Sequence, residues 1–510
     1  MNKSYRAQTA LYLHSQRALL MSTNHELHNV YRSVLGGRYA SKEMQELFSE
    51  RQKVLYWRQL WIWLAEAQMV SELGLAIVNE EQINDMKEHA DEIDWALVKT
   101  LEKQTRHDVM AHVHAFERVA AKAKGIIHLG ATSAYVQDNA DLLTMRRAID
   151  NLLKRVKTCL HRLRMFAVEH KHLATVGRTH YQPASLTTVG KRAALWAQDL
   201  LLAFEHLSNA RSSLLFRGVK GATGTQNSFL ILFNNNAEKV EALDRKVSAK
   251  AGFGSEDMPE KLIITGQTYT RMQDCSVLCA LGMIGAAVHK AAMDIRMLQC
   301  FGEISEPFEN TQVGSSAMPY KRNPMRSERC CGLARFLINL IPNSFHTEAI
   351  QGFERTLDDS SNRRLLLPEA FLTTDALLIT FQNVVEGLRV NHSSIAAHVE
   401  AELPFLSLES VLMHLTLHGV DRQVAHEKIR RLALMAHKER EQTGKSIDLS
   451  RLLAEDELFE SIWPQLDNLL NADHHVGLCA RQVDEFVRDK LEPIFKNSNS
   501  DLFASTELDV

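Results

Sequence analysis

The clearest pattern in the chain is a series of apolar residues at helical intervals through its middle. From Leu186 to Leu207, apolar residues recur alternately three and four positions apart, and this spacing predicts an α-helix with a continuous apolar face. Ala197, Leu201 and Phe204 form a second apolar face beside the first. A helix that is apolar on two faces must be covered by several neighbours, so we expect it inside a helical bundle.

Two further segments have the same character. Cys275–Val288 is almost continuously apolar and its apolar pattern continues to Leu298. The length of this apolar run is typical of a buried core helix and short for a membrane span. A third helix is predicted over Glu369–Leu388, with Pro368 just ahead of it in the position that proline favours at a helix start.

Residues that break helices are scarce. The 510 residues include ten prolines and 23 glycines, below the averages of about 5% and 7%. A β-sandwich, barrel or propeller requires frequent turn signals, which this sequence lacks. We therefore predict an all-α fold of three domains, with a central bundle of long helices. The N-terminal helical domain spans residues 1–132 and begins with an extension of about 30 residues, the central domain spans 133–390, and the C-terminal helical domain spans 391–510.

Charge and cysteine content narrow the class of protein. The formal net charge of −3 gives no general electrostatic basis for binding nucleic acid or an anionic membrane. The seven cysteines include adjacent Cys330 and Cys331 and no Cys-x-x-Cys pair, as in a reduced, cytoplasmic protein. The N-terminus also lacks the apolar segment of a secretory signal. His107, His112 and His114 match no standard zinc spacing, and we predict neither a metal nor a cofactor.

The segment Gly314–Pro324, GSSAMPYKRNP, interrupts the helical pattern. Its two prolines and its Gly-Ser-Ser opening exclude regular helix or strand. We predict a loop, followed by a helix over Met325–Ile341 that starts at Pro324. A serine in such a loop is usually an ordinary turn residue. However, hydroxyls, a lysine and a flexible glycine together have the composition of an active-site lid.

A second unusual segment is THYQPA, which contains His180. We expect it to join the end of one helix to the beginning of the next. A lone histidine at such a junction is usually a surface residue, but polar Thr179 and Gln182 beside it favour a role in proton transfer.

Polar and basic residues also gather in short segments that are loop-like or lie at helix ends. They are Arg38, Tyr39, Arg106, His107, Asp108, Thr132, Ser133, Lys220, Gln267, Arg355, Ser360 and Arg364. Basic residues in such places usually form a solvated surface. Hydroxyls and backbone amides at helix starts beside arginines also bind carboxylate and phosphate, and the pattern alone leaves both interpretations open.

Taken together, these segments resemble the fumarase/aspartase superfamily, whose members cleave a C–N or C–O bond and release fumarate. The loop GSSAMPYKRNP is similar to the signature of that superfamily. The segments RHDVMAHVH, GIIHLGATS, THYQPA, TTVGKR, TGQTY and FERTLDDSSNRR resemble the adenylosuccinate lyase family, most closely its long animal-type form. The resemblance runs from about residue 30 to about residue 495.

The resemblance implies a β-elimination. A base removes a proton beside a carboxylate of the succinyl group, and an acid then protonates the departing nitrogen. By resemblance Ser315 is the base and His180 the acid. Glu328 would pair with His180 and keep its imidazolium form available, and His107 would help to hold the succinyl group. Lys321 and loop N–H groups would lower the pKa of the serine hydroxyl.

The resemblance also assigns residues to substrate binding. Lys321, Asn323, Thr132 and Ser133 would stabilise the developing carboxylate dianion. Phosphate and ribose contacts are assigned to Arg38, Tyr39, Arg329, Ser360 and Arg364, with Arg355 alongside, Gln267 on the amide or carboxylate side, and Arg106 and Asp108 nearby. The implied substrates are two nucleotides of purine biosynthesis, adenylosuccinate and succinylaminoimidazole carboxamide ribotide. Each would release fumarate.

Quaternary structure is implied as well. Members of the family are homotetramers whose long helices merge into one core, with each active site assembled from three subunits. Two alternatives are another fumarate-releasing lyase of the same fold and a catalytically silent helical scaffold. The second alternative is disfavoured because Ser315, His180, Lys321 and Glu328 are all present.

Overall fold

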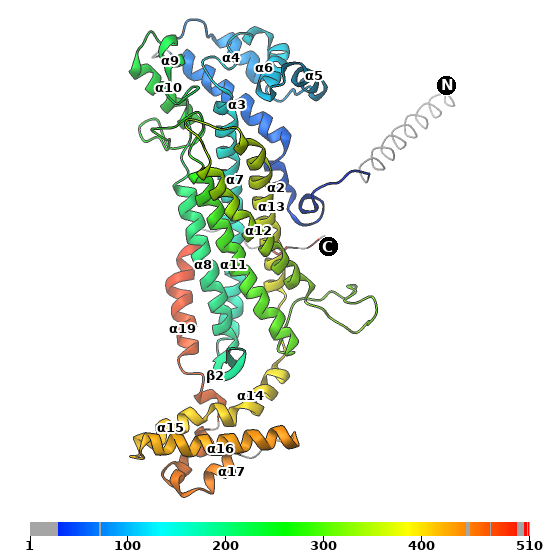
Figure 1. Cartoon of the computed structure of the whole chain (residues 1–510), viewed down its shortest axis with the longest axis vertical. Helices are drawn as coiled ribbons and strands as arrows, with labels where there is room; N and C mark the ends of the chain where they lie inside the picture. The colour runs from blue at the N-terminus through cyan, green and yellow to red at the C-terminus, as the bar shows by residue number, and fades with distance from the viewer. Residues whose placement is uncertain are drawn as a thin grey trace, which may run out of the picture.

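The structure, a computed structural model, is an elongated helical bundle with smaller helices at both ends (Figure 1). It describes residues 29–70, 73–444, 449–469, 471–496, 504–506 and 508, so most of the predicted N-terminal extension lies outside the described residues. Five long helices pack against one another along the bundle. They are α7 (Ser133–Glu169), α8 (Val189–Ser212), α11 (Met272–Cys300), α12 (Met325–Ala349) and α13 (Asp358–Glu386). The predicted all-α class is confirmed.

Shorter helices cover the two ends of the bundle (Figure 1). At the end where α7 begins lie α3 (Glu50–Met69), α4 (Glu80–Glu88), α5 (Trp95–Thr105), α6 (Asp108–Val119), α9 (Asn227–Leu232) and α10 (Ala237–Lys250). The short turns η1 (Leu35–Tyr39) and η2 (Ala121–Ala123) and helix α2 (Lys42–Leu47) also belong to the N-terminal part of the chain.

At the other end lie α14 (His392–Leu406), α15 (Leu408–Leu417), α16 (Arg422–Thr443) and α17 (Leu449–Ala454). The chain continues through η3 (Glu457–Gln465), α18 (Leu466–Leu469) and η4 (Ala472–His474). Helix α19 (Cys479–Phe486) then packs on α8, followed by η5 (Val487–Leu491) and α20 (Glu492–Phe495). The helices from α15 to α18 have a hydrophobic core of their own, built around Val411, Leu453 and Phe459.

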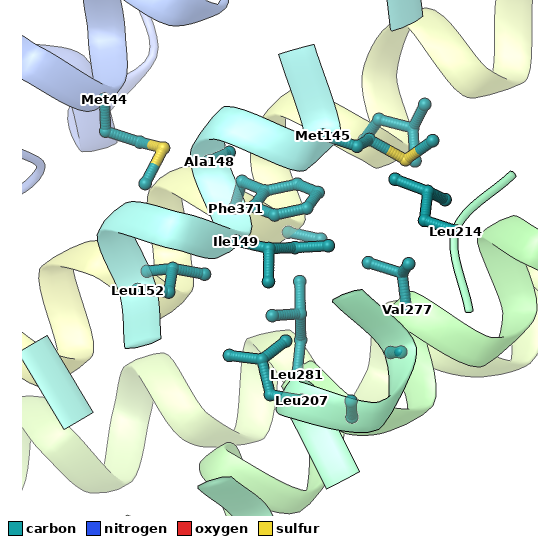
Figure 2. Close-up of a cluster of buried hydrophobic side chains, with 14 of the residues drawn as sticks. Met44, Met145, Ala148, Ile149, Leu152, Leu207, Leu214, Val277, Leu281 and Phe371 are labelled. Atoms are coloured by element: carbon teal, nitrogen blue, oxygen red, sulfur yellow. The ribbon is translucent and has the colours of Figure 1, made fainter. Parts of the chain in front are cut away.

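The main core fills the centre of the bundle. Figure 2 shows Ile149 of α7, Leu207 of α8, Leu281 of α11 and Phe371 of α13 converging on one cluster, with Met44 of α2 at its edge. All five side chains are almost completely removed from solvent. Burial of each such side chain stabilises the fold by about 1.5–3 kcal/mol. Leu207 belongs to the heptad pattern seen in the sequence, so that pattern marks the face of α8 that packs inside the bundle.

A buried network of charges fixes the beginning of α13. The Arg271 guanidinium lies 3.1 Å from an Asp138 carboxylate oxygen and 2.7 Å from one of Asp359. Beside it, Arg363 donates to Asp274 over 2.7 Å. Buried charges persist only when they are paired with good geometry. This pairing therefore holds the first turns of α13, which carry Ser360 and Arg364.

Two predicted helix boundaries near proline are wrong. Helix α13 begins at Asp358 and has Pro368 inside it, and α12 continues through Pro342 beyond the predicted end at Ile341. An internal proline costs about 3 kcal/mol in an isolated helix. In α13, buried Leu367 and Phe371 lie on both sides of the proline, and their packing offsets that cost.

The predicted helix junction at His180 is also wrong. Residues Ala174–Thr179 form strand β1 and residues Gln182–Thr188 form strand β2, paired antiparallel as a hairpin. Helix α8 therefore begins at Val189 and not at Leu186. Four of the thirteen strand residues are threonines, and β-branched side chains favour strands. A second small sheet pairs β3 (Ile304–Ser305) with β4 (Arg389–Val390).

Among the described residues, α11 and α13 are long and apolar enough to cross a membrane by length and composition alone. In these helices, 67% and 78% of the most apolar window is buried inside the protein. Core helices of soluble proteins pass the same test, so this finding is weak evidence for a membrane span.

Candidate active site

The segment Gly314–Pro324 is an irregular loop, as predicted, and it leads directly into α12. The connection between α11 and α12 projects from the side of the bundle (Figure 1). Ser315 Oγ accepts hydrogen bonds from the backbone N–H groups of Ala317 and Met318, over 3.3 and 3.1 Å. Such donors stabilise negative charge on an oxygen. The two N–H groups therefore point at the Ser315 hydroxyl oxygen, where they would stabilise a negative charge.

The two arms of the loop are in contact. The Asn323 side-chain amide donates to the carbonyl of Gly314 over 2.8 Å. A Cβ atom at Gly314 would lie only 2.1 Å from the Lys321 carbonyl oxygen, so only glycine allows this approach. The structure thus brings Ser315, Lys321 and Asn323 into one compact loop, with the Lys321 side chain exposed.

The first turns of α12 carry two further predicted residues. The Arg329 guanidinium lies 5.1 Å from the centre of the Tyr39 ring, and that of Arg38 lies 5.9 Å from the same ring. Glu328 is half exposed and lies 3.8 Å from Arg296. We call these seven residues the loop group: Arg38, Tyr39, Ser315, Lys321, Asn323, Glu328 and Arg329.

A second set of predicted residues meets where α6 and α7 begin. His107 caps α6, and its Nδ1 accepts a hydrogen bond from Met110 N over 3.4 Å. The proton of a neutral ring is then on Nε2, which lies 3.3 Å from Ser133 Oγ. Thr132 is the N-cap residue of α7, and Arg106 ends α5 in a left-handed conformation with φ 54°.

Asp108 joins this set to α13 because Arg364 donates to its carboxylate over 2.9 Å. Burial raises the pKa of Asp108, but the Val109 N–H and the Arg364 charge outweigh it and hold the pKa below its ordinary value. Ser360 and Arg364 line a cavity of about 290 Å³ together with Arg355.

Arg355 in turn donates to Gln267 Oε1 over 2.7 Å. This contact completes a second cluster of predicted residues in the part of the chain where α7 and α13 begin. We call it the head group: Arg106, His107, Asp108, Thr132, Ser133, Gln267, Arg355, Ser360 and Arg364.

His180 stands apart from both groups. It occupies the two-residue turn between β1 and β2 with Tyr181, and their φ values are 52° and 60°. Two positive φ angles are typical of the type I′ turn that matches the twist of a hairpin. His180 and Tyr181 are both exposed, so the turn presents the imidazole to solvent at its tip.

One chain cannot bring the hairpin and the head group together. Helix α7 has 37 residues and, at 1.5 Å per residue, is about 55 Å long. The head group lies at its beginning and the hairpin follows its end, so α6 and β2 are at opposite ends of the bundle (Figure 1).

The loop group is also distant from the head group. Arg326, at the start of α12, donates to Asn383 near the end of α13. Arg364 lies on the same helix, roughly 28 Å away at the rise of an α-helix. Glu328 and His180, predicted as partners, have no contact with each other among the interactions of the described residues.

Lys220, which the sequence placed among the candidate residues for binding an anion, has a different role. Its ammonium lies 2.8 Å from Asp244 Oδ2 and is almost completely buried. Asp244 also accepts from the Val219 N–H. A buried lysine must be paired to keep its charge, so Lys220 is a structural residue and does not belong to the groups above.

His128 is a residue that the sequence interpretation missed. Its Nδ1 accepts a 2.9 Å hydrogen bond from the Trp61 indole, so the proton of the neutral ring is on Nε2. Burial, with a smaller effect from the charge of His107, lowers its pKa to about 4. The signal in the sequence is a single polar residue inside the apolar segment GIIHLG.

The buried histidines predict loss of stability in acid. Burial lowers the pKa values of His112 and His128 to about 4, whereas an unfolded histidine titrates near 6.5. Between these values the unfolded chain binds protons that the folded chain does not. The stability therefore falls as pH falls, by up to about 1.4 kcal/mol per pH unit for each histidine. Thermal unfolding from pH 7 to 4.5 measures this slope, and His112→Gln should reduce it; an identical slope would contradict the assignment.

Among the described residues, no group of three or more His, Cys, Asp or Glu side chains is placed to hold a metal ion. The loop group, the head group and His180 mainly supply hydroxyls, imidazoles, carboxylates and basic side chains. These are the groups needed for proton transfer and for binding an anionic substrate.

Comparisons with known proteins show the family and the fold. The family described as "Lyase" matches residues 38–337, and the family described as "Adenylosuccinate lyase C-terminus" matches residues 404–486. Among solved structures, a 3-carboxy-cis,cis-muconate lactonizing enzyme from Pseudomonas putida has a TM-score of 0.79 at 21% identity, covering 91% of this chain and 100% of that one. A fumarate lyase from Mesorhizobium sp. BNC1 has a TM-score of 0.76 at 20% identity, with 90% and 100% covered. These two likenesses show the fold.

Sequence relatives are much closer. An adenylosuccinate lyase from Caenorhabditis briggsae is 49% identical over 94% of this chain and 99% of its own length. The adenylosuccinate lyase of Schizosaccharomyces pombe is 47% identical over 90% of this chain and 94% of its own length. Because these matches cover at least 90% of this chain and of each relative, the chain belongs to the adenylosuccinate lyase family.

Proposed function

We propose that this protein is an adenylosuccinate lyase of purine biosynthesis. It would convert adenylosuccinate to AMP, and succinylaminoimidazole carboxamide ribotide to the carboxamide ribotide, with release of fumarate in each reaction. The observation that carries the proposal is the Ser315 loop. Its hydroxyl oxygen accepts two backbone N–H bonds in a chain 49% identical to an adenylosuccinate lyase.

In the proposed reaction Ser315 Oγ takes a proton from the carbon next to a succinyl carboxylate. The electron pair left on that carbon forms the new double bond of fumarate as the C–N bond breaks. His180 gives its proton to the departing nitrogen. Asn323 donates to the carbonyl of Gly314, the residue before Ser315. Asn323 and Lys321 of the same loop would supply the N–H donor and the positive charge that a carboxylate dianion needs. Glu328 would pair with His180 and keep it protonated.

The head group would hold the succinyl part and the phosphate. His107 and Ser133 lie 3.3 Å apart and, with Thr132, would bind a carboxylate. Ser360, Arg364 and Arg355 line the cavity described above and suit a phosphate dianion. In the loop group, Arg38, Tyr39 and Arg329 would contact phosphate and ribose, with Gln267, Arg106 and Asp108 completing the substrate site from the head group.

The distances between the loop group, the head group and His180 support a site shared between subunits. Residues about 55 Å apart along α7 can act on one substrate only if different chains supply them. Apolar side chains on the bundle support the same proposal. Leu195 and Leu202 of α8 and Phe336 and Phe345 of α12 are each 45–49% exposed in the single chain. Such surfaces are typical of oligomer interfaces, so we propose that the protein is a homotetramer. We also propose that it lies in the cytoplasm and that each chain is divided into domains at about residues 132 and 390.

Assays of the purified protein test the function. Fumarate release is measured with adenylosuccinate, with succinylaminoimidazole carboxamide ribotide and with argininosuccinate as a substrate that carries no phosphate. We expect turnover of the first two and none of the third. Turnover of argininosuccinate alone would contradict the proposal and favour another fumarate-releasing lyase, and no turnover at all would favour a silent scaffold.

A further inference from the structure

A buried glutamate joins the two ends of the loop that carries Ser315. Glu306 follows β3 and begins the irregular connection of residues 306–324, which contains the Gly314–Pro324 loop, and α12 begins immediately after that connection. One carboxylate oxygen of Glu306 accepts from Arg326 N over 2.9 Å, and the other accepts from Ser327 N over 2.8 Å and from Ser327 Oγ over 2.7 Å. Glu306 is only 3% exposed, so its carboxylate relies on these three donors in place of water.

Gln299, at the end of α11, makes a second bridge at the same place. Its side-chain oxygen accepts from Glu306 N over 3.1 Å, and its amide donates to the carbonyl of Arg322 over 3.0 Å. The Arg322 guanidinium lies 5.2 Å from the Phe308 ring. The two chain segments that leave the bundle are therefore tied at their base, and the loop beyond them has a fixed origin.

The partners of Glu306 show what this tie controls. Arg326 and Ser327 are the second and third residues of α12, and Glu328 and Arg329 of the loop group follow them. The free N–H groups at a helix start carry partial positive charge, and a carboxylate placed on them fixes that end of the helix. A shift of this end would move Glu328, Arg329 and the loop with Ser315 together.

We propose that Glu306 is a positioning residue for the elimination reaction, because its carboxylate sets the origin of the Ser315 loop and the first turn of α12. The proposal rests on the proposed function for its kinetic consequences, but the structural tie is independent of it. Glu306 is buried among the backbone donors of α12, so it acts on the substrate only through the residues that it holds.

The test compares Glu306→Gln with the wild-type tetramer. A glutamine can accept from one of the two N–H groups but turns its own NH₂ toward the other, so the tie is broken at one side. We expect kcat to fall by about a hundredfold, the effect of misplacing catalytic groups by about 1 Å. We also expect faster hydrogen exchange of amides in residues 307–329, with exchange elsewhere unchanged.

Two further variants sharpen the test. Ser327→Ala removes one of the three hydrogen bonds and should give a smaller decrease in kcat with the same local change in exchange, even if Glu306→Gln does not fold. Glu309→Gln is the matched control. Glu309 pairs with the side chain of the same Arg326, but the Glu309 carboxylate is 64% exposed and solvent screens its charge, so the kcat of this variant should stay within about twofold of wild type.

Mixed tetramers separate a positioning role from general destabilisation. If Glu306 acts through its own loop, activity returns when Glu306→Gln is mixed with His180→Ala, which supplies a native loop. It does not return on mixing with Ser315→Ala, where every loop is defective. Unchanged loop exchange with kcat near that of Glu309→Gln would overturn the proposal, as would faster exchange throughout the protein. If the wild-type protein has no lyase activity, the proposed function fails, while the exchange data still decide on the tie.

Discussion

Replacement of Ser315 by alanine is expected to lower kcat by roughly a thousandfold, the size of effect seen when a general base is removed. The hydroxyl oxygen at this position accepts two backbone N–H bonds, and alanine leaves those donors without the oxygen that would lose its proton. Binding is expected to change little, because the proton transfer belongs to the transition state. The decrease should therefore be in kcat, with KM within a few-fold of wild type.

The neighbouring serine supplies the control. Ser316 lies in the same loop and is exposed, and Ser316→Ala makes the same chemical change one residue away. Steady-state release of fumarate is measured for both variants after the tetramer is verified by light scattering. Near-normal turnover by Ser315→Ala, or an equal loss in Ser316→Ala, would show that another group is the base.

Mixing two inactive variants is expected to restore activity. Ser315→Ala keeps a native hairpin and His180→Ala keeps a native loop, and the two segments of one site would come from different chains. With random reassembly of equal amounts, about a quarter of the sites in a closed symmetric oligomer receive both native segments. The measurement is fumarate release after unfolding and refolding the two variants together.

Two controls define what a recovery means. Each variant refolded alone should stay inactive, and a mixture of Ser315→Ala with the double variant Ser315→Ala/His180→Ala should recover nothing, because it contains no native loop. Absence of recovery in the main mixture, with subunit exchange verified by mass spectrometry, would contradict a shared site.

Helical periodicity was sufficient to predict the bundle. The seam through Trp196, Leu200 and Leu207 corresponds to buried faces of α8, because residues three and four apart share a helix face whatever the rest of the chain does. The boundaries at Pro342 and Pro368 could not be predicted in this way. They depend on packing between helices, which offsets the free-energy cost of an internal proline. That packing involves residues far apart in the chain, so the local sequence does not indicate it.

The chemistry of the site was more visible than its arrangement. The loop at Ser315 was recognisable from its prolines and glycine, since these residues exclude regular structure. The hairpin at His180 was not, because its turn residues, histidine and tyrosine, are not the Asn-Gly type that usually signals a positive-φ turn. Lys220 was indistinguishable from a ligand-binding lysine until Asp244 was seen beside it. The residue roles and the domain boundaries stay predictions.

The length of α7 has a consequence for how this protein would respond to its own concentration. Because α7 is about 55 Å long, the head group and His180 of one chain cannot contact the same substrate molecule. On the proposed assembly, a dissociated subunit would be inactive even where it kept its fold. Specific activity would then fall on dilution at the concentration where the tetramer dissociates, and catalysis would report directly on the association equilibrium.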